Sequence, residues 1–231
     1  MAVRIDIVSI GTLSRNRLWN EPQPVRTPHA TTTLLRAKDG NDERERRILV
    51  DPGLPAAALA ARLFERTGLR PAEIDLVFLT NFRPAHRAAL ELFPDAPWLL
   101  ADVEREAVGN HLSELKDRSD DPDVRKVVAT ELRLLDRTKS PEDKLAEQID
   151  LFPLAGYTPG TCGLLVAESA STTLVAGDAV PTRDHLLAGQ VLADAFDKDA
   201  ALESLREVYE IADAIVPGHD NWFLNPRSYG A

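Results

Sequence analysis

The chain has 231 residues, of which 44% are hydrophobic and 28% charged, so it can bury a sizeable core. Its net charge of −10 argues against general affinity for nucleic acid, which requires a positive surface. No apolar run approaches the ~20 residues that span a bilayer, and we expect no signal peptide. The single cysteine, Cys162, rules out an internal disulfide and fits a reducing cytoplasm.

Hydrophobic patterning predicts both strands and helices in the first hundred residues. Residues 55–67 carry apolar side chains at helical spacing, with Leu63 and Phe64 on one face. Gly68 follows, where a helix commonly ends in a left-handed cap. We expect a further short helix over residues 86–92. Runs rich in Val, Ile, Leu and Thr predict strands at residues 4–10, 31–37, 47–50 and 74–79.

Residues 102–147 form the most charged part of the chain. Blocks at residues 124–135 and 142–149 predict amphipathic helices between polar linkers, and we interpret the region as a solvated helical insertion. Two sharper roles stay open: the insertion walls one side of an active-site mouth, or it forms a contact in a homodimer. Beyond it, we expect strands at residues 164–167 and 172–176, and a helix at residues 199–211.

The most informative segment is Leu79–His86, in which a predicted strand ends in Leu-Thr and runs into Asn-Phe-Arg-Pro-Ala-His. Four other segments combine an apolar strand end with Gly, Pro, Asp or His: Ile48–Gly53, Gly156–Gly160, Ala176–Ala179 and Val216–His219. Together the five segments are similar to landmarks of the metallo-β-lactamase superfamily. They occur in the family's order, and the resemblance covers nearly the whole chain.

This resemblance implies an α/β (α+β) fold, a four-layer αββα sandwich of two mostly antiparallel sheets with helices outside. It also implies a single domain over residues 1–231 that contains the charged insertion at about 102–147. In the superfamily, the strand is followed by His-x-His-x-Asp-His. These residues hold two zinc ions together with Gly-His-Thr-Pro-Gly, Gly-Asp and Pro-Gly-His segments.

Carried onto this chain, the resemblance leaves the first metal without ligands, because its positions read Asn81, Arg83 and Tyr157. The Asn81 amide oxygen is a weak neutral ligand. The Arg83 guanidinium has only donors, and Tyr157 would ligate only after ionising from a pKa near ~10. We therefore expect no dinuclear zinc centre.

The second metal position retains more of its ligands. His86, Asp178 and His219 would remain, while Ala85 replaces a carboxylate. Two His and one carboxylate are a sufficient ligand set for a catalytic zinc, and they also describe non-haem iron sites. The expected cofactor is therefore none, or one divalent metal: zinc, iron or manganese. The three residues could equally persist for structure, by hydrogen bonding to one another.

The orientation of Arg83 bears on that choice. We expect it to point inward, where a permanent cation near Asp178 would repel a divalent ion. Two unit charges at about 4 Å interact by ~4 kcal/mol at a dielectric constant of 20. An inward Arg83 would either form an ion pair or present its donors to an anionic ligand. The alternative is a side chain that turns out to solvent.

The remaining histidines and the cysteine do not belong to any of the ligand or nucleophile motifs. His29 and His111 are expected to be solvated, and His185 has no ligand role although it follows Asp178 closely. Cys162 is expected to pack as a small buried hydrophobe, because no nucleophile motif surrounds it.

These residues favour a protein of hydrolase ancestry with a degenerate metal site, catalytically impaired or a ligand-binding pseudoenzyme. Its partner would be a small molecule, anionic or carbonyl-bearing, with neither nucleic acid nor membrane expected. The alternative is a mononuclear metal-dependent hydrolase of an ester, thioester or lactone that uses His86, Asp178 and His219. No further catalytic residue is assigned.

Overall fold

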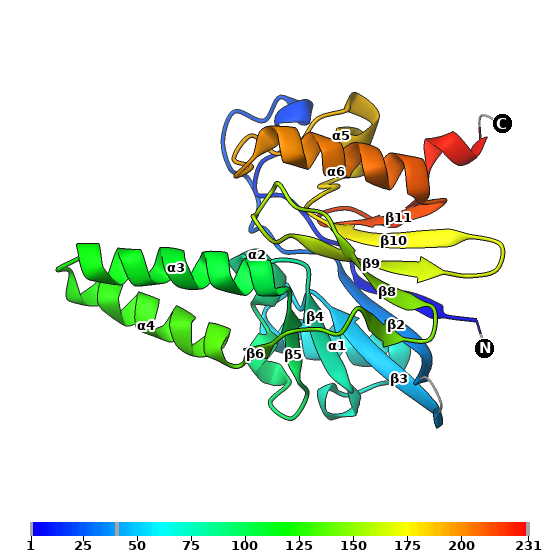
Figure 1. Cartoon of the computed structure of the whole chain (residues 1–231), viewed down its shortest axis with the longest axis horizontal. Coiled ribbons are helices and arrows are strands. Elements are labelled where there is room, and N and C mark those ends of the chain that lie inside the picture. The colour runs from blue at the N-terminus through cyan, green and yellow to red at the C-terminus, as the bar shows by residue number, and fades with distance from the viewer. Residues whose placement is uncertain (1, 40–41, 230–231) are drawn as a thin grey trace.

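Two β-sheets pack face to face at the centre of the molecule, with helices on their outer faces (Figure 1). The computed structural model describes residues 2–39 and 42–229, and within them each sheet has six strands. The first sheet contains, in spatial order, β1 (Arg4–Ser9), β2 (Thr32–Asp39), β3 (Asp42–Val50), β4 (Leu76–Leu79), β5 (Trp98–Leu100) and β6 (Thr138–Lys139). The second contains β12 (Phe223–Leu224), β11 (Ala214–Pro217), β10 (Thr172–Gly177), β9 (Cys162–Ala167), β8 (Ile149–Pro153) and β7 (Lys144–Ala146).

Neighbouring residues on the central strands point into two different cores. Leu34 and Leu49 pack in the outer core of the first sheet, whereas Leu35, Ile48 and Val50 pack between the sheets. Successive side chains of a strand point to opposite faces, so both faces of β2 and β3 are buried. This explains why these strands read as nearly continuous apolar runs.

The predicted sandwich is confirmed, but both of its sheets are mixed, and the expected mostly antiparallel pairing was wrong for the first sheet, where three of the five strand pairs are parallel. The strands β3 to β6 run parallel in succession, and β10 runs parallel to β11. The remaining strand pairs of the described residues are antiparallel. Each parallel pair needs a crossover connection, and the helices supply these connections.

The outer helices cover the two sheets. α1 (Ala56–Thr67) ends at Gly68, which has the expected left-handed conformation with φ 74°. Leu63 is buried, but Phe64 is 56% exposed, so the predicted apolar face was wrong for Phe64. Phe64 lies about 100° further round the helix than Leu63. The other helices near the sandwich are α2 (Pro84–Arg87), α5 (Arg183–Ala188) and α6 (Lys198–Ile211). In the described part of the chain, no helix is long and apolar enough to cross a membrane.

The charged insertion begins with α3 (Asp102–Arg118) and α4 (Pro122–Asp136), a helical hairpin that projects from the sandwich (Figure 1). We call this hairpin the arm. The helix predicted at residues 142–149 is wrong, because β7 and the start of β8 lie there. Leu145 and Ile149 are buried between the sheets, and this packing outweighs local helical periodicity. The helix predicted at residues 86–92 is also divided, into α2 and a 3-10 turn, Leu90–Leu92.

Candidate metal centre

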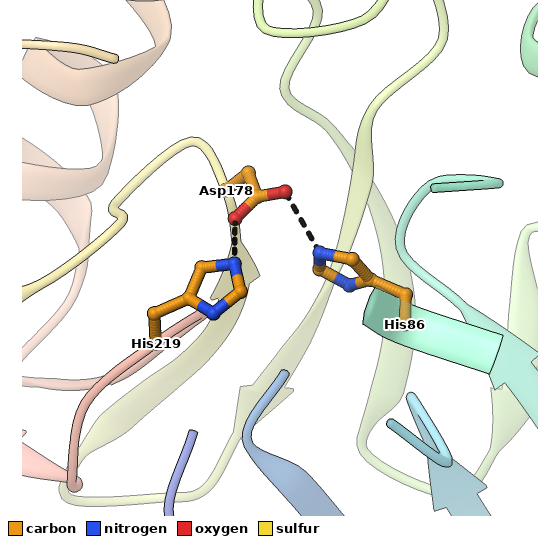
Figure 2. A group of neighbouring side chains, drawn as sticks. All are labelled: His86, Asp178 and His219. Carbon is orange, nitrogen blue, oxygen red and sulfur yellow. Dashed lines mark hydrogen bonds and ion pairs between the residues drawn. The ribbon is translucent and has the colours of Figure 1, made fainter. Parts of the chain in front are cut away.

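Three polar side chains from distant parts of the chain meet at the ends of the strands (Figure 2). His86 lies on α2, Asp178 follows β10, and His219 follows β11. We call them the trio. Their ligand atoms all lie within 4.8 Å of one another, and all three residues are buried. Asp178 Oδ2 lies 2.7 Å from His86 Nε2, and Asp178 Oδ1 lies 3.0 Å from His219 Nε2. The structure thus brings together the three ligands that the sequence predicted.

Two glycines allow this close approach. β10 ends at Gly177, whose φ of 53° lies in the left-handed region. A Cβ atom there would lie 2.5 Å from Thr80 Oγ1, and one on Gly218 would lie 2.7 Å from Asp178 Oδ1. A larger residue at either position would therefore displace the Asp178 segment.

Asp51 orients the imidazole ring of His86. Its Oδ2 accepts a hydrogen bond from His86 Nδ1 at 2.9 Å. The same carboxylate accepts the Thr80 backbone N–H at 2.9 Å and the Thr80 hydroxyl at 2.7 Å, so its position is fixed. Since Nδ1 carries the proton, the lone pair of a neutral His86 lies on Nε2 and faces Asp178.

Two backbone carbonyl groups orient the imidazole ring of His219 so that its Nε2 also faces Asp178. Its Nδ1 lies 3.1 Å from the carbonyl oxygen of Thr12 and 3.0 Å from that of His29. Both atoms are acceptors, so Nδ1 must carry a proton. The lone pair of a neutral His219 therefore also faces Asp178, through Nε2.

The trio consequently requires a positive charge. Two imidazole lone pairs facing one carboxylate are mutually repulsive unless an added proton or a metal cation lies between them. In the metal-free protein, burial opposes a charge on His86, but Asp178 and Asp51 outweigh it and raise the pKa of His86 to about 10. Burial likewise opposes ionisation of Asp178, yet His86 and His219 hold its pKa well below the usual range.

The donor set fits one divalent metal ion. Asp178 Oδ1 is buried and lacks a well-aligned hydrogen bond, although His219 Nε2 is within ion-pair distance of it. Two imidazole nitrogens and this carboxylate oxygen are ligands that zinc and iron accept. The Asp51–His86 contact matches the carboxylate that commonly fixes the ring of a metal-bound histidine. His86, Asp178 and His219 are thus suited to hold a single ion.

The order of the strands and the place of the trio agree with the comparison with known proteins. A profile of the metallo-β-lactamase superfamily matches residues 29–219. This chain belongs to the metallo-β-lactamase superfamily. No curated protein sequence matches it.

Solved structures of the superfamily resemble the whole molecule. A Thermotoga maritima protein assigned as a metallo-β-lactamase is 19% identical, with a TM-score of 0.69 over 97% of this chain and 100% of the other. The dizinc quorum-quenching lactonase AidC, in complex with the product N-hexanoyl-L-homoserine, is 15% identical, with a TM-score of 0.63 over 82% and 72%. An N-acyl homoserine lactone hydrolase, with that product bound at its catalytic metal centre, is 19% identical, with a TM-score of 0.64 over 95% and 94%. At sequence identities of 15% and 19%, the likeness between this chain and these structures shows a shared fold and nothing further.

Asn81, which was expected at the first ligand position, presents a donor to the trio. Its Oδ1 accepts the Arg83 backbone N–H at 2.9 Å, which fixes the orientation of the amide. Its Nδ2 therefore points inward and donates to Asp178 Oδ2 at 3.0 Å. An N–H group cannot ligate a metal, so Asn81 is unsuited to hold the first ion.

Tyr157 was expected at the position of a further ligand to the first metal. The residue is buried, and this burial, together with the charge of Asp178, raises its pKa above the ordinary value for tyrosine. The phenol therefore stays protonated at neutral pH and is a poor ligand.

Arg83 does not have the expected inward orientation. Its guanidinium carbon lies 5.0 Å from the centre of the Tyr157 ring, and Nη2 lies 3.8 Å from Asp194. The side chain is 44% exposed, and no contact with Asp178 occurs among the described residues. Pro84 begins α2 and restricts Arg83 to an extended backbone, with φ −64° and ψ 145°. The expected repulsion of a metal ion by Arg83 was therefore wrong.

The remaining positions have structural contacts. Ala85 is half-buried, and its carbonyl oxygen accepts the Ala30 N–H at 2.8 Å. His185 is buried close to the trio, where burial lowers its pKa, and its Nδ1 lies 2.8 Å from Thr182 Oγ1. Burial raises the pKa of the Cys162 thiol to about 11, as suits a packed residue.

The functional roles of Asp51 and Thr80 were missed by sequence reasoning. Asp51 was recognised only as part of a strand-and-turn landmark. One signal could have found it, because Asp between a buried strand and Pro52-Gly53 commonly marks a special backbone conformation. In the structure Asp51 indeed has a left-handed φ of 51° and is buried.

A cleft of about 610 Å³ opens between the arm and the loop that carries Tyr157. Arg83 lies in its wall, and Phe196, also in the wall, is 75% exposed. Side chains of α3 form the facing wall. Half of the lining residues are apolar or aromatic, and the polar half includes the carboxylates of Glu104, Glu114 and Glu131 beside Arg83 and Arg87. The apolar half consists of Phe82, Pro84, Ala107, Val108, Leu112, Tyr157, Pro159 and Phe196.

Proposed function

We propose that this protein is a metallo-β-lactamase-fold member of hydrolase ancestry that has lost the dinuclear zinc centre and binds a small molecule without efficient turnover. The observation that carries this proposal is the inward N–H of Asn81, which is bound to the carboxylate that would bridge two ions. Tyr157, protonated and buried, supports the same conclusion for the first metal position.

The ligand is proposed to lie in the cleft beside the arm. The volume of about 610 Å³ is in the range of small-molecule sites, ~300–1,000 Å³. Apolar side chains would hold the body of the ligand. Arg83, weakly paired with Asp194 at 3.8 Å, is available to bind an anionic or carbonyl oxygen. The N-hexanoyl-L-homoserine bound by two structural neighbours has both an apolar chain and a carboxylate.

A second candidate is a mononuclear metal-dependent hydrolase, favoured by the orientation of both imidazole rings. Asp51 and the two backbone carbonyls direct both Nε2 lone pairs toward Asp178, as a metal site needs. One bound divalent ion would supply a Lewis acid and an activated water for hydrolysis of an ester, thioester or lactone. The residues of the chain would contribute the ligands, the fixed ring orientation and the cleft.

Metal analysis and turnover separate these candidates. Protein purified without chelator, and then offered zinc, iron or manganese, should bind no more than one equivalent in both cases. Two equivalents would overturn the loss of the dinuclear centre. The ligand-binding proposal expects no metal-dependent hydrolysis of N-hexanoyl homoserine lactone or of an aryl thioester. Hydrolysis that disappears in His219→Ala together with the bound metal would establish the second candidate instead.

Binding in the cleft has a separate test. N-hexanoyl-L-homoserine is a suitable probe, because it joins an apolar chain to a carboxylate. We expect it to raise the melting temperature of the wild-type protein and to bind Arg83→Gln more weakly. An exposed arginine outside the cleft, Arg118, provides the matched control as Arg118→Gln. Equal binding by both variants would contradict the assignment of Arg83.

A further inference from the structure

Glu104 is a charged residue buried where the arm meets the sandwich. It lies in the first turn of α3 and is 1% exposed. One carboxylate oxygen accepts the backbone N–H of Phe82 at 3.0 Å, and the other accepts the backbone N–H of Gly160 at 3.1 Å. Among the described residues, no cationic side chain pairs with it. Burying a carboxylate is costly unless its oxygens are bound, so these two N–H groups are its compensation.

The two N–H groups belong to the two loops that replace the first metal site. Phe82 lies between Asn81 and Arg83, and Gly160 belongs to the turn that follows Tyr157. Gly160 has no space for a side chain, because a Cβ atom would lie 2.1 Å from the backbone nitrogen of Glu104. The start of α3 is therefore in direct contact with both loops.

The carbonyl group of Phe82 is linked to the second helix of the arm through Arg87 of α2. The Phe82 carbonyl oxygen accepts a hydrogen bond from Arg87 Nε at 2.8 Å, and the Arg87 guanidinium lies over the Phe82 ring at 4.2 Å. Arg87 in turn forms an ion pair with Glu131 of α4. Both helices of the arm are thus connected to the backbone of Phe82, α3 directly through Glu104 and α4 through Glu131 and Arg87.

We propose that Glu104 is a positioning residue, which holds the Asn81–Arg83 loop against the Tyr157 loop and so sets the placement of Arg83 over the Tyr157 ring in the cleft. The proposal rests on the proposed function insofar as Arg83 binds the ligand. It adds that the arm is part of the binding site through Glu104, although Glu104 itself need not touch the ligand.

Replacing Glu104 by glutamine distinguishes a positioning role from a role in which the side chain only fills space. Glu104→Gln has the same shape, but its amide nitrogen would face one of the two N–H groups, donor against donor. A residue that only fills space would tolerate this change. Glu106→Gln is the matched control, because Glu106 lies two residues further along α3, carries the same charge and is exposed.

Amide hydrogen exchange tests the positioning role without any ligand or metal. We expect exchange to accelerate about tenfold or more in Glu104→Gln at whichever of the Phe82 and Gly160 amides faces the new side-chain nitrogen, since a hydrogen bond to a charged group is lost there. Exchange in β3 and β9 should not change, and Glu106→Gln should match the wild type at all sites. Wild-type exchange rates at both amides in Glu104→Gln would overturn the proposal.

A double-mutant cycle tests the connection to Arg83. The fluorescent probe 1-anilinonaphthalene-8-sulfonate is apolar and anionic, so it suits the cleft. We expect Arg83→Gln to weaken its binding in the wild-type background and to have at most a third of that effect, as a fold-change, in the Glu104→Gln background. Equal effects in both backgrounds would show that the residues act independently and would overturn the positioning role. If the wild type fails to bind the probe, the cleft assignment is wrong, and hydrogen exchange still decides whether Glu104 holds the two loops.

Discussion

The side-chain amide of Asn81 donates a hydrogen bond to Asp178 Oδ2 at 3.0 Å, and the Arg83 backbone N–H prevents that amide from turning round. The oxygen that would bridge two metal ions is therefore already bound to a donor. If the dinuclear centre is lost as proposed, this contact explains the loss more directly than the charge of Arg83, whose side chain is 44% exposed.

Histidines placed at the three expected ligand positions should increase metal uptake. We expect the combined variant Asn81→His, Arg83→His and Tyr157→His to bind more metal per chain than the wild type, by elemental analysis after incubation with zinc. Arg83→His alone should change little, because Arg83 does not contact Asp178 in the wild type. An unchanged metal content in the combined variant would show that more than these ligands prevents a second ion from binding.

Asp51 should affect metal binding although it is not a ligand. Asp51→Asn removes the carboxylate that accepts the His86 Nδ1 proton, so the ring loses its fixed orientation. We expect zinc affinity to fall by ~10–100-fold, measured by competition with a chelating dye. Asp95→Asn, an exposed aspartate outside the site, is the control. Equal affinities for the two variants would exclude this orienting role.

The metal-free protein should lose stability as the pH rises. The pKa of His86 is about 10 in the folded protein, against an ordinary value of 6.5. A raised pKa means that the folded state holds the proton more tightly than the unfolded state. The stabilisation is therefore complete below about pH 6.5 and is lost as the pH approaches 10.

Urea unfolding with chelator present can measure this dependence. Between pH 7 and 9 the free energy of unfolding should fall by up to about 1.4 kcal/mol per pH unit. His86→Gln should show a flatter dependence, since it cannot bind the proton. Parallel curves for the two proteins would mean that His86 is not the group that titrates.

Cys162 should be inert in the folded protein. The thiol is buried, and burial raises its pKa to about 11, so little thiolate forms at pH 8. A chromogenic disulfide reagent should not react in native buffer but should react with one thiol per chain in denaturant. Rapid reaction of the native protein would show that β9 opens readily.

Sequence patterns predicted helices and strands best where the hydrophobic periodicity of a segment agrees with its packing in the fold. The helix of Ala56–Thr67 and its cap at Gly68 follow from spacing and from the conformational freedom of glycine. Residues 142–149 show the opposite case. Their helical spacing is outweighed by the burial of Leu145 and Ile149 between the sheets, and the chain forms β7 and β8.

The sequence by itself predicted the family correctly and pointed to His86, Asp178 and His219 as candidate ligands, because the chemistry of a ligand depends on residue type. Tertiary structure alone decided how those side chains are used. It decided that Arg83 faces Asp194 and not Asp178, that Asp51 contacts His86, and that Glu104 accepts hydrogen bonds from Phe82 and Gly160. These contacts join residues far apart in the chain. Such contacts leave no local pattern, because the partner of a hydrogen bond is chosen by the fold.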